Sequence, residues 1–237
     1  QKRRLEFMAE RLVVFDIEML NNDPGSICSI GIVEMIDFKI VSTYYSLIKP
    51  KCLKHDSIRY SIHHIKVEDL IYERSFDQVW KEIKYYFEDS IVVSHDISVD
   101  MTHIRATMIQ YGLTYPYVKM SCTNVLAHLL HPELQKYNLV ELTKIYDFKH
   151  KAHHALEDAK ACAYILKCMV KNEGFDDLTS LHMHYHIAFG EMKHNYYRNI
   201  ISPETIVHLK NYQKLRLMIY IIKLYVLPES FQYQKKY

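Results

Sequence analysis

The sequence predicts an α/β fold in which a mixed β-sheet is flanked by helices. Two observations support this prediction. Three strand-like segments come first, and the chain then alternates between short apolar runs and segments whose apolar residues recur at helical spacing. After residue 177 no strand pattern is convincing. We therefore expect one α/β domain over residues 1–174 and a C-terminal helical appendage over residues 175–237.

Three strands are expected at the start of the domain. Residues 12–17 form an apolar run rich in β-forming residues, which is typical of a buried strand. A turn cluster at residues 21–26 separates this run from two further strands, at residues 27–35 and 40–48. The connection at residues 37–39 is short enough for a hairpin.

Helices dominate the rest of the domain. Apolar residues at positions 76, 79, 83 and 87 predict a helix that begins near Ser75. A short strand is expected at residues 91–93, and Gly112 is expected to close a helix at residues 97–111. Further helices are expected at residues 121–130, 139–146 and 154–171.

The appendage is expected to contain an amphipathic helix. Pro203 and Glu204 provide a helix start, and apolar residues recur at helical spacing from residue 206 to 222. We expect this segment to offer a surface for a protein partner or for self-association.

The composition limits the class of protein. Hydrophobic residues make up 49% and charged residues 24% of the chain, which is typical of a soluble globular protein. A net charge of +2 is too small to indicate a nucleic-acid partner by itself. The five cysteines form no CxxC pair, which argues against a zinc site or a disulfide framework. No signal peptide is visible, and the apolar stretch at residues 215–227 is too short to span a bilayer, so we expect a cytoplasmic protein without membrane contact.

Two acidic residues end the first expected strand. Asp16 and Glu18 are two positions apart, so their side chains point to the same face of the strand. Two carboxylates on one face repel each other unless a cation lies between them, and their oxygen atoms favour Mg²⁺ or Mn²⁺ over zinc. The alternative is a strand that simply runs out into solvent.

Two later segments carry further candidate groups. Asp100 lies at the start of the helix that follows the strand at residues 91–93, where α/β sheets place their sites. Its alternative role is an acid that complements the helix dipole. His153 and Asp158 are five residues apart at the start of the last helix of the domain, so both side chains can face one cleft. A polar helix N-terminus is the alternative there.

The order of these motifs resembles that of the DEDDh exonucleases, the DnaQ-like group that includes proofreading subunits of bacterial DNA polymerases. The similarity includes residues other than the acids. It is to the stand-alone and polymerase III epsilon-like bacterial members of the group. Residues 94–100 resemble the family's His-Asn-x-x-Phe-Asp motif, and residues 62–65 its Ile-His-Gly-Ile segment. Further similarity is carried by residues 15–18, 26–33 and 152–159.

This resemblance implies a ribonuclease-H-like fold and a catalytic site with two divalent cations, Mg²⁺ or Mn²⁺. The implied reaction is removal of nucleoside monophosphates from a free, single-stranded 3′ end. His153 is the implied general base. The implied metal ligands are Asp16, Glu18, Asp100 and Asp158.

Several positions depart from the family pattern, and they concern the substrate more than the chemistry. Asp96 replaces the usual Asn, Val99 the usual Phe, and His64 the usual Gly. The residues expected to contact substrate are Met19, Leu20, His63, Asp96 and Val99.

Two other functions stay open at this point. The same acids and base would serve an exoribonuclease acting on RNA 3′ ends, although we favour DNA. The chain could also be an exonuclease-fold recruitment module in a larger nucleic-acid-processing complex.

Overall fold

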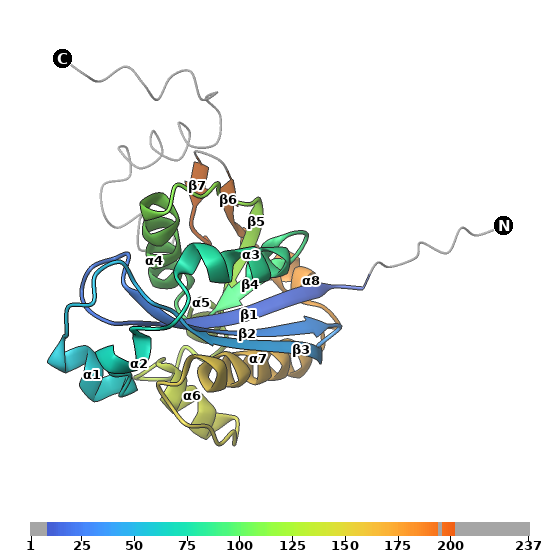
Figure 1. Ribbon diagram of the computed structural model, residues 1–237. Coiled ribbons are helices and arrows are strands. Elements are labelled where there is room, and N and C mark those ends of the chain that lie inside the picture. Colours follow the sequence, from blue (N-terminus) through green and yellow to red (C-terminus); the bar gives the residue numbers. More distant parts are fainter. Residues whose placement is uncertain (1–8, 194–195, 202–237) are drawn as a thin grey trace, which may run out of the picture.

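The computed structural model describes residues 9–193 and 196–201, in which seven strands form one mixed sheet (Figure 1). The strand order is β3-β2-β1-β4-β5-β6-β7, with β1, β4 and β5 parallel to one another and the other pairs antiparallel. The strands are β1 (Arg11–Met19), β2 (Ile27–Ile36), β3 (Lys39–Leu47), β4 (Ile91–Ser94), β5 (Val118–Cys122), β6 (Gly190–Lys193) and β7 (Tyr196–Arg198).

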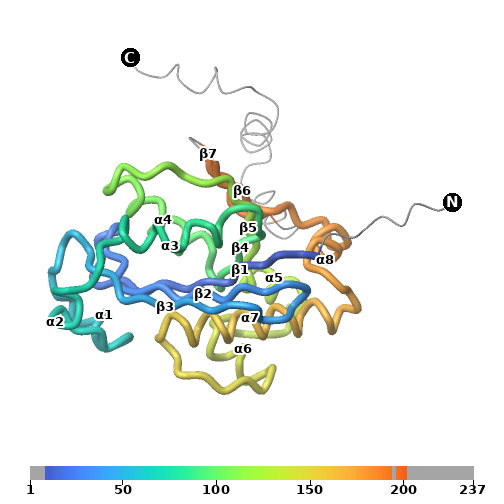
Figure 2. Tube along the Cα trace, turned by 45° about the vertical axis from the view of Figure 1, so that its right-hand side comes forward, coloured from blue at the N-terminus to red at the C-terminus, as the bar shows by residue number. Residues whose placement is uncertain are grey.

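Helices cover both faces of this sheet (Figures 1 and 2). Helices α6 and α7 lie on one face, where α7 packs on β1 and β2, whereas α3 and α4 lie on the other. Within the described residues, no helix has the length and apolar character needed to cross a membrane. The helices are α1 (Ser57–His63), α2 (Val67–Leu70), α3 (Phe76–Phe87), α4 (Ile97–Gln110), α5 (Thr123–Leu130), α6 (Leu139–Ile145), α7 (Ala155–Asn172) and α8 (Leu178–His184).

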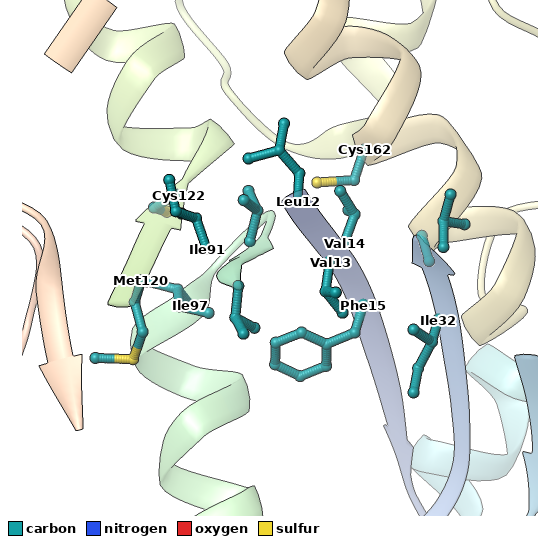
Figure 3. Packing of buried hydrophobic residues seen from close by; sticks show 14 of the residues in the cluster. Leu12, Val13, Val14, Phe15, Ile32, Ile91, Ile97, Met120, Cys122 and Cys162 are labelled. Atoms are coloured by element: carbon teal, nitrogen blue, oxygen red, sulfur yellow. The ribbon is translucent and has the colours of Figure 1, made fainter. Parts of the chain in front are cut away.

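The central strand β1 is buried on both faces from Leu12 to Phe15, which explains the apolar run at these four positions. Val14 points toward Cys162 of α7, whereas Phe15 points to the opposite face (Figure 3). There the Phe15 ring packs edge-on against Phe87 of α3, with ring centroids 5.6 Å apart. Because side chains alternate along a strand, Asp16 faces α7, as Val14 does.

The hairpin between β2 and β3 is confirmed. Asp37 and Phe38 form its turn, and both have positive φ angles, of 49° and 60°. Two successive residues with positive φ are the pattern of a type I′ turn, which matches the twist of the strands it joins. The Phe38 ring is buried, so the turn is held by the core as well.

Most predicted elements are confirmed, but two expectations were wrong and two helices were missed. The helix expected at residues 121–130 begins only at Thr123, because Ser121 and Cys122 belong to strand β5; this five-residue strand is too short for a clear pattern. Helices α1 and α2 were not foreseen, because they are only one to two turns long. Strands do occur after residue 177: β6 pairs with β5, and β7 with β6. At three or four residues each, these strands carry no readable periodicity.

The predicted helix at residues 206–222, with its expected partner surface, lies outside the described residues. The domain boundary at residue 174 stays a prediction, although the sheet itself continues through Arg198.

Gly31 on β2 lets α7 approach the sheet closely. A Cβ atom at this position would lie 2.2 Å from the backbone nitrogen of Leu156 and 2.3 Å from the carbonyl carbon of Ala155, in the first turn of α7. We expect Gly31→Ala to destabilise the protein by about 3 kcal/mol, the upper end of the usual range for overpacking, because rigid backbone must shift. Urea unfolding would measure this loss. In Gly112→Ala the added Cβ meets no atom within 4 Å, so only the strain of its φ of +63° remains, about 1 kcal/mol. Equal losses in the two variants would contradict the close-approach explanation.

Candidate active site

Three elements bring the four acids to one region of the molecule. Asp16 and Glu18 lie near the carboxyl end of β1, which runs parallel to β4. Asp100 is in the first turn of α4, directly after β4, and Asp158 is in the first turn of α7, which packs on β1. The parallel pairing of β1 with β4 therefore places Asp100 beside the end of β1, and α7 adds Asp158.

The pKa values of these carboxyl groups indicate mutual proximity. Burial raises the pKa of Asp16 well above its usual value, and the charges of Asp100, Glu18 and Asp158 raise it further. The pKa of Glu18 rises to about 8, first through burial and then through Asp158 and Asp100. Burial also raises the pKa of Asp100 to about 7, and that of Asp158 above its usual value. The four groups cannot all be ionised in the folded protein without a compensating positive charge.

The donor atoms fit a divalent cation. Glu18, His153 and Asp158 each offer one ligand atom, and these atoms lie within 4.8 Å of one another. Asp16 and Asp100 add carboxylate oxygens nearby, because Asp100 raises the pKa values of both Glu18 and Asp16, and Glu18 raises that of Asp16. A set dominated by carboxylate oxygens is the kind that Mg²⁺ and Mn²⁺ prefer.

This arrangement makes stability depend on pH in the metal-free protein. Glu18 and Asp100 hold protons in the folded state up to about pH 8 and 7, whereas the unfolded chain releases them near pH 4. The folded state therefore binds more protons, and its stability falls as pH rises through this window. The buried histidines with lowered pKa values, such as His182 at about 4, act in the opposite sense but only below about pH 6.5.

We therefore expect the melting temperature in EDTA to fall by about 3–6 °C between pH 6.5 and 8. Saturating Mn²⁺ should abolish the fall, because a bound cation favours the ionised carboxylates. Differential scanning calorimetry on the wild type and Glu18→Gln would check this. An equally steep fall in Glu18→Gln would contradict the role of this carboxyl group.

His153 is the exposed member of the site. It precedes α7 in a left-handed backbone conformation, with a φ of 63°. The backbone N–H of His153 donates to the Asp158 carboxylate, which links the loop to the helix. The imidazole is therefore held beside the acids while its ring stays open to solvent.

The expected substrate residues divide into exposed and buried groups. Val99 is 49% exposed on α4, and Asp96 is exposed just before this helix. Met19 and Leu20 are buried in the core, at 4% and 2% exposure, so these side chains would have to move before a base could reach them. His63 is also buried, with Nε2 3.1 Å from the Met19 carbonyl oxygen. The contact of all five with substrate stays a prediction.

His150 is a buried neighbour of the site that the sequence did not reveal. Its Nε2 lies 3.0 Å from Oδ1 of Asp158, and its side chain is 4% exposed. His150 is not among the three groups whose ligand atoms lie within 4.8 Å of one another, so it contacts a candidate ligand without belonging to that set. The seven residues between the two positions include an irregular loop, so no periodicity pointed to this pair.

We expect His150 to orient the Asp158 carboxylate. His150→Ala should raise the Mn²⁺ concentration for half-maximal activity by about 10–100-fold, as the loss of an outer partner of a metal ligand does. His150→Gln, which keeps an N–H donor, should restore part of the affinity. Titration of activity and of the melting temperature with Mn²⁺ would measure this effect. His184→Ala, an exposed histidine on α8, is the matched control. The assignment fails if His150→Ala titrates like this control.

Comparison with known proteins supports the resemblance to exonucleases. The RNase_T family model, described as an exonuclease, matches residues 13–166. The chain is 28% identical over 226 residues to a DNA polymerase III PolC-type protein of Clostridium perfringens, covering 91% of this chain and 15% of that protein. It is 27% identical over 202 residues to the 3′-5′ exonuclease DinG of Staphylococcus epidermidis, covering 77% of this chain and 22% of that protein. The chain thus spans less than a quarter of the length of either relative.

A solved structure extends the similarity to three dimensions. Exonuclease X in complex with 5′ overhanging duplex DNA superimposes with a TM-score of 0.57 at 25% identity, over 69% of this chain and 93% of that one. The expected ribonuclease-H-like fold, a mixed sheet flanked by helices, is confirmed. Because the family model covers more than half of its residues, the chain belongs to the RNase_T exonuclease family, and its expected membership among the DEDDh exonucleases is confirmed.

Proposed function

We propose that this chain is a metal-dependent 3′–5′ exonuclease that removes nucleoside monophosphates from single-stranded 3′ ends, with DNA favoured over RNA. One observation carries the proposal: carboxylates from β1, α4 and α7 meet beside one exposed imidazole. The names of the PolC-type and DinG relatives, which concern DNA polymerisation and 3′-5′ exonuclease activity, support DNA as the substrate.

The acids are proposed to hold two divalent cations, Mg²⁺ or Mn²⁺. Bound cations of this kind supply positive charge that neutralises a phosphodiester and makes water more acidic. The proposed ligands are Asp16, Glu18, Asp100 and Asp158.

His153 is proposed to act as the general base. Its exposed imidazole lies beside Asp158, where a water molecule attacking the phosphodiester can give up a proton to a ring nitrogen. The phosphodiester bond to the terminal nucleotide then breaks, and the remaining strand leaves with a free 3′ hydroxyl group. Val99, exposed at the start of α4, is the proposed contact for the terminal base.

The test is cleavage of matched single-stranded DNA and RNA oligomers that carry a 5′ or a 3′ label. With Mg²⁺ or Mn²⁺, 5′-labelled DNA should shorten stepwise, 3′-labelled DNA should release a labelled mononucleotide, and EDTA should stop both. Faster turnover of RNA would favour the exoribonuclease. Absence of products with either nucleic acid and either cation would favour the recruitment module.

A further inference from the structure

Residues 53–67, which contain α1, carry positive charge that the fold does not neutralise. The three cations Lys54, Arg59 and Lys66 outnumber the one acid of this segment, Asp56. Asp56 is occupied as the N-cap of α1, because its Oδ1 accepts the backbone N–H groups of Ile58 and Arg59. None of the three cations makes an ion pair within the part of the chain that the structure describes. Residues 53–67 thus hold a net charge of +2, and the acids Glu68 and Asp69 follow directly, so the positive charge is local to Lys54, Arg59 and Lys66.

Hydrogen bonds hold the segment against Asn21 and Asn22, which follow Glu18 closely in the chain. Nδ2 of Asn21 donates to the Lys54 carbonyl oxygen at 2.9 Å. Asn22 donates to the Asp56 carboxylate at 3.1 Å, and its own Oδ1 accepts from Nε of Arg59 at 3.4 Å. These contacts tie the segment to the residues that follow the candidate metal ligand on β1.

A buried contact shows the same proximity. Nε2 of His63, which ends α1, lies 3.1 Å from the carbonyl oxygen of Met19, the residue after Glu18. The basic segment and the end of β1 that carries the acidic site therefore lie side by side.

A pocket of 460 Å³ opens on this segment, within the size range of small-ligand sites. The Tyr60 ring lies in its wall, with the rings of His55 and His64 centred 5.7 Å and 5.9 Å from it. The lining also holds one cation, Lys66, and one acid, Glu68. An aromatic ring with cations along its rim is the combination that binds single-stranded nucleic acid without reading its sequence. The pocket is lined by Leu53, His55, Tyr60, Lys66, Val67 and Glu68.

We propose that residues 53–67 bind the nucleotides that precede the terminal one on the substrate strand, with one base in the Tyr60 pocket. The backbone phosphates of these nucleotides then face Lys54, Arg59 and Lys66. This inference rests on the proposed exonuclease function and assigns the path of the strand outside the acidic site. Its ligand class is a single strand several nucleotides long, of DNA or RNA.

The test compares a dinucleotide with a 12-nucleotide single strand of the same 3′ sequence. Tyr60→Ala should raise KM for the 12-mer by about 10-fold and leave kcat unchanged, because only the binding of upstream nucleotides is weakened. Cleavage of the dinucleotide should be unaffected, since it does not reach the pocket. Tyr60→Phe should retain wild-type KM, because it keeps the ring. Tyr72→Ala is the matched control, since Tyr72 is 96% exposed and does not line the pocket.

A second variant keeps the result clear if Tyr60→Ala does not fold. Lys66→Glu should raise KM for the 12-mer and reduce its dependence on salt. The proposal is overturned if the folded variants among Tyr60→Ala and Lys66→Glu have the same KM for the 12-mer as Tyr72→Ala. It is also overturned if they slow cleavage of the dinucleotide as much as cleavage of the 12-mer. In either case cleavage by the wild type would leave the proposed function intact. If the wild type cleaves neither substrate with any divalent cation, the proposed function itself fails.

Discussion

Replacing Asp100 by asparagine is expected to abolish cleavage while making the metal-free protein more stable. The variant keeps the size and shape of the side chain but removes the charge that raises the pKa values of Asp16 and Glu18. Cation binding should weaken, and kcat/KM should fall by at least about 10³-fold, equivalent to about 4 kcal/mol of transition-state stabilisation. In EDTA at pH 8 the same change relieves repulsion between buried groups, so the melting temperature should rise.

The opposite signs of these two effects make the experiment decisive. Single-turnover cleavage of labelled single-stranded DNA would measure the loss, and scanning calorimetry with and without Mn²⁺ would measure the gain. The control is Glu157→Gln, one residue from Asp158, because Glu157 forms an ion pair with Lys160 outside the acid cluster. Retained cleavage in Asp100→Asn would contradict the assignment of Asp100 to a metal site.

The second large effect is expected at His153. His153→Ala should lower kcat by about 10²–10⁴-fold, the usual contribution of a general base. Alanine is disfavoured at the φ of 63° found there, so loss of activity in that variant alone could reflect a moved loop. His153→Asn removes this ambiguity, because asparagine tolerates the left-handed conformation but cannot take up the proton.

Both His153 variants should keep the stabilisation by Mn²⁺, since the carboxylates are intact. Steady-state kinetics and melting curves across a Mn²⁺ titration would measure the two properties separately. An active His153→Asn variant would rule out proton transfer at this residue. Loss of the Mn²⁺ response in both variants would assign His153 to metal binding instead.

The elements that carry the candidate acids were easier to predict from the sequence than the edges of the sheet. Each of these acids lies in an element with a strong local signal: Asp16 in a buried strand, and Asp100 and Asp158 in the first turns of long helices. The spatial meeting of the acids required tertiary information, which came from the resemblance to a family. Strands β6 and β7 were missed because short strands at a sheet margin depend on pairing with a neighbour, not on local pattern.

The neighbours of the site were harder to foresee for a related reason. His150 contacts Asp158 from an irregular loop, and the charge of Arg59, on a two-turn helix, opposes the rise in the pKa of Glu18. The spacing of these two residues in the sequence does not indicate that they lie near the site. The sequence also did not show that Met19 and Leu20 are buried. They lie beside an acid at the end of a strand, and they were therefore expected to contact substrate.

Strand β6 also determines which fragment of this chain can be handled in isolation. It covers one side of β5, and Nε2 of His182, in the helix before it, hydrogen-bonds with Ser121 of β5 at 2.8 Å. A fragment cut after residue 174 would leave the hydrogen-bonding groups of β5 uncovered, and exposed strand edges recruit other chains. Such a fragment would tend to aggregate, whereas one that continues through Ile201 keeps this margin closed.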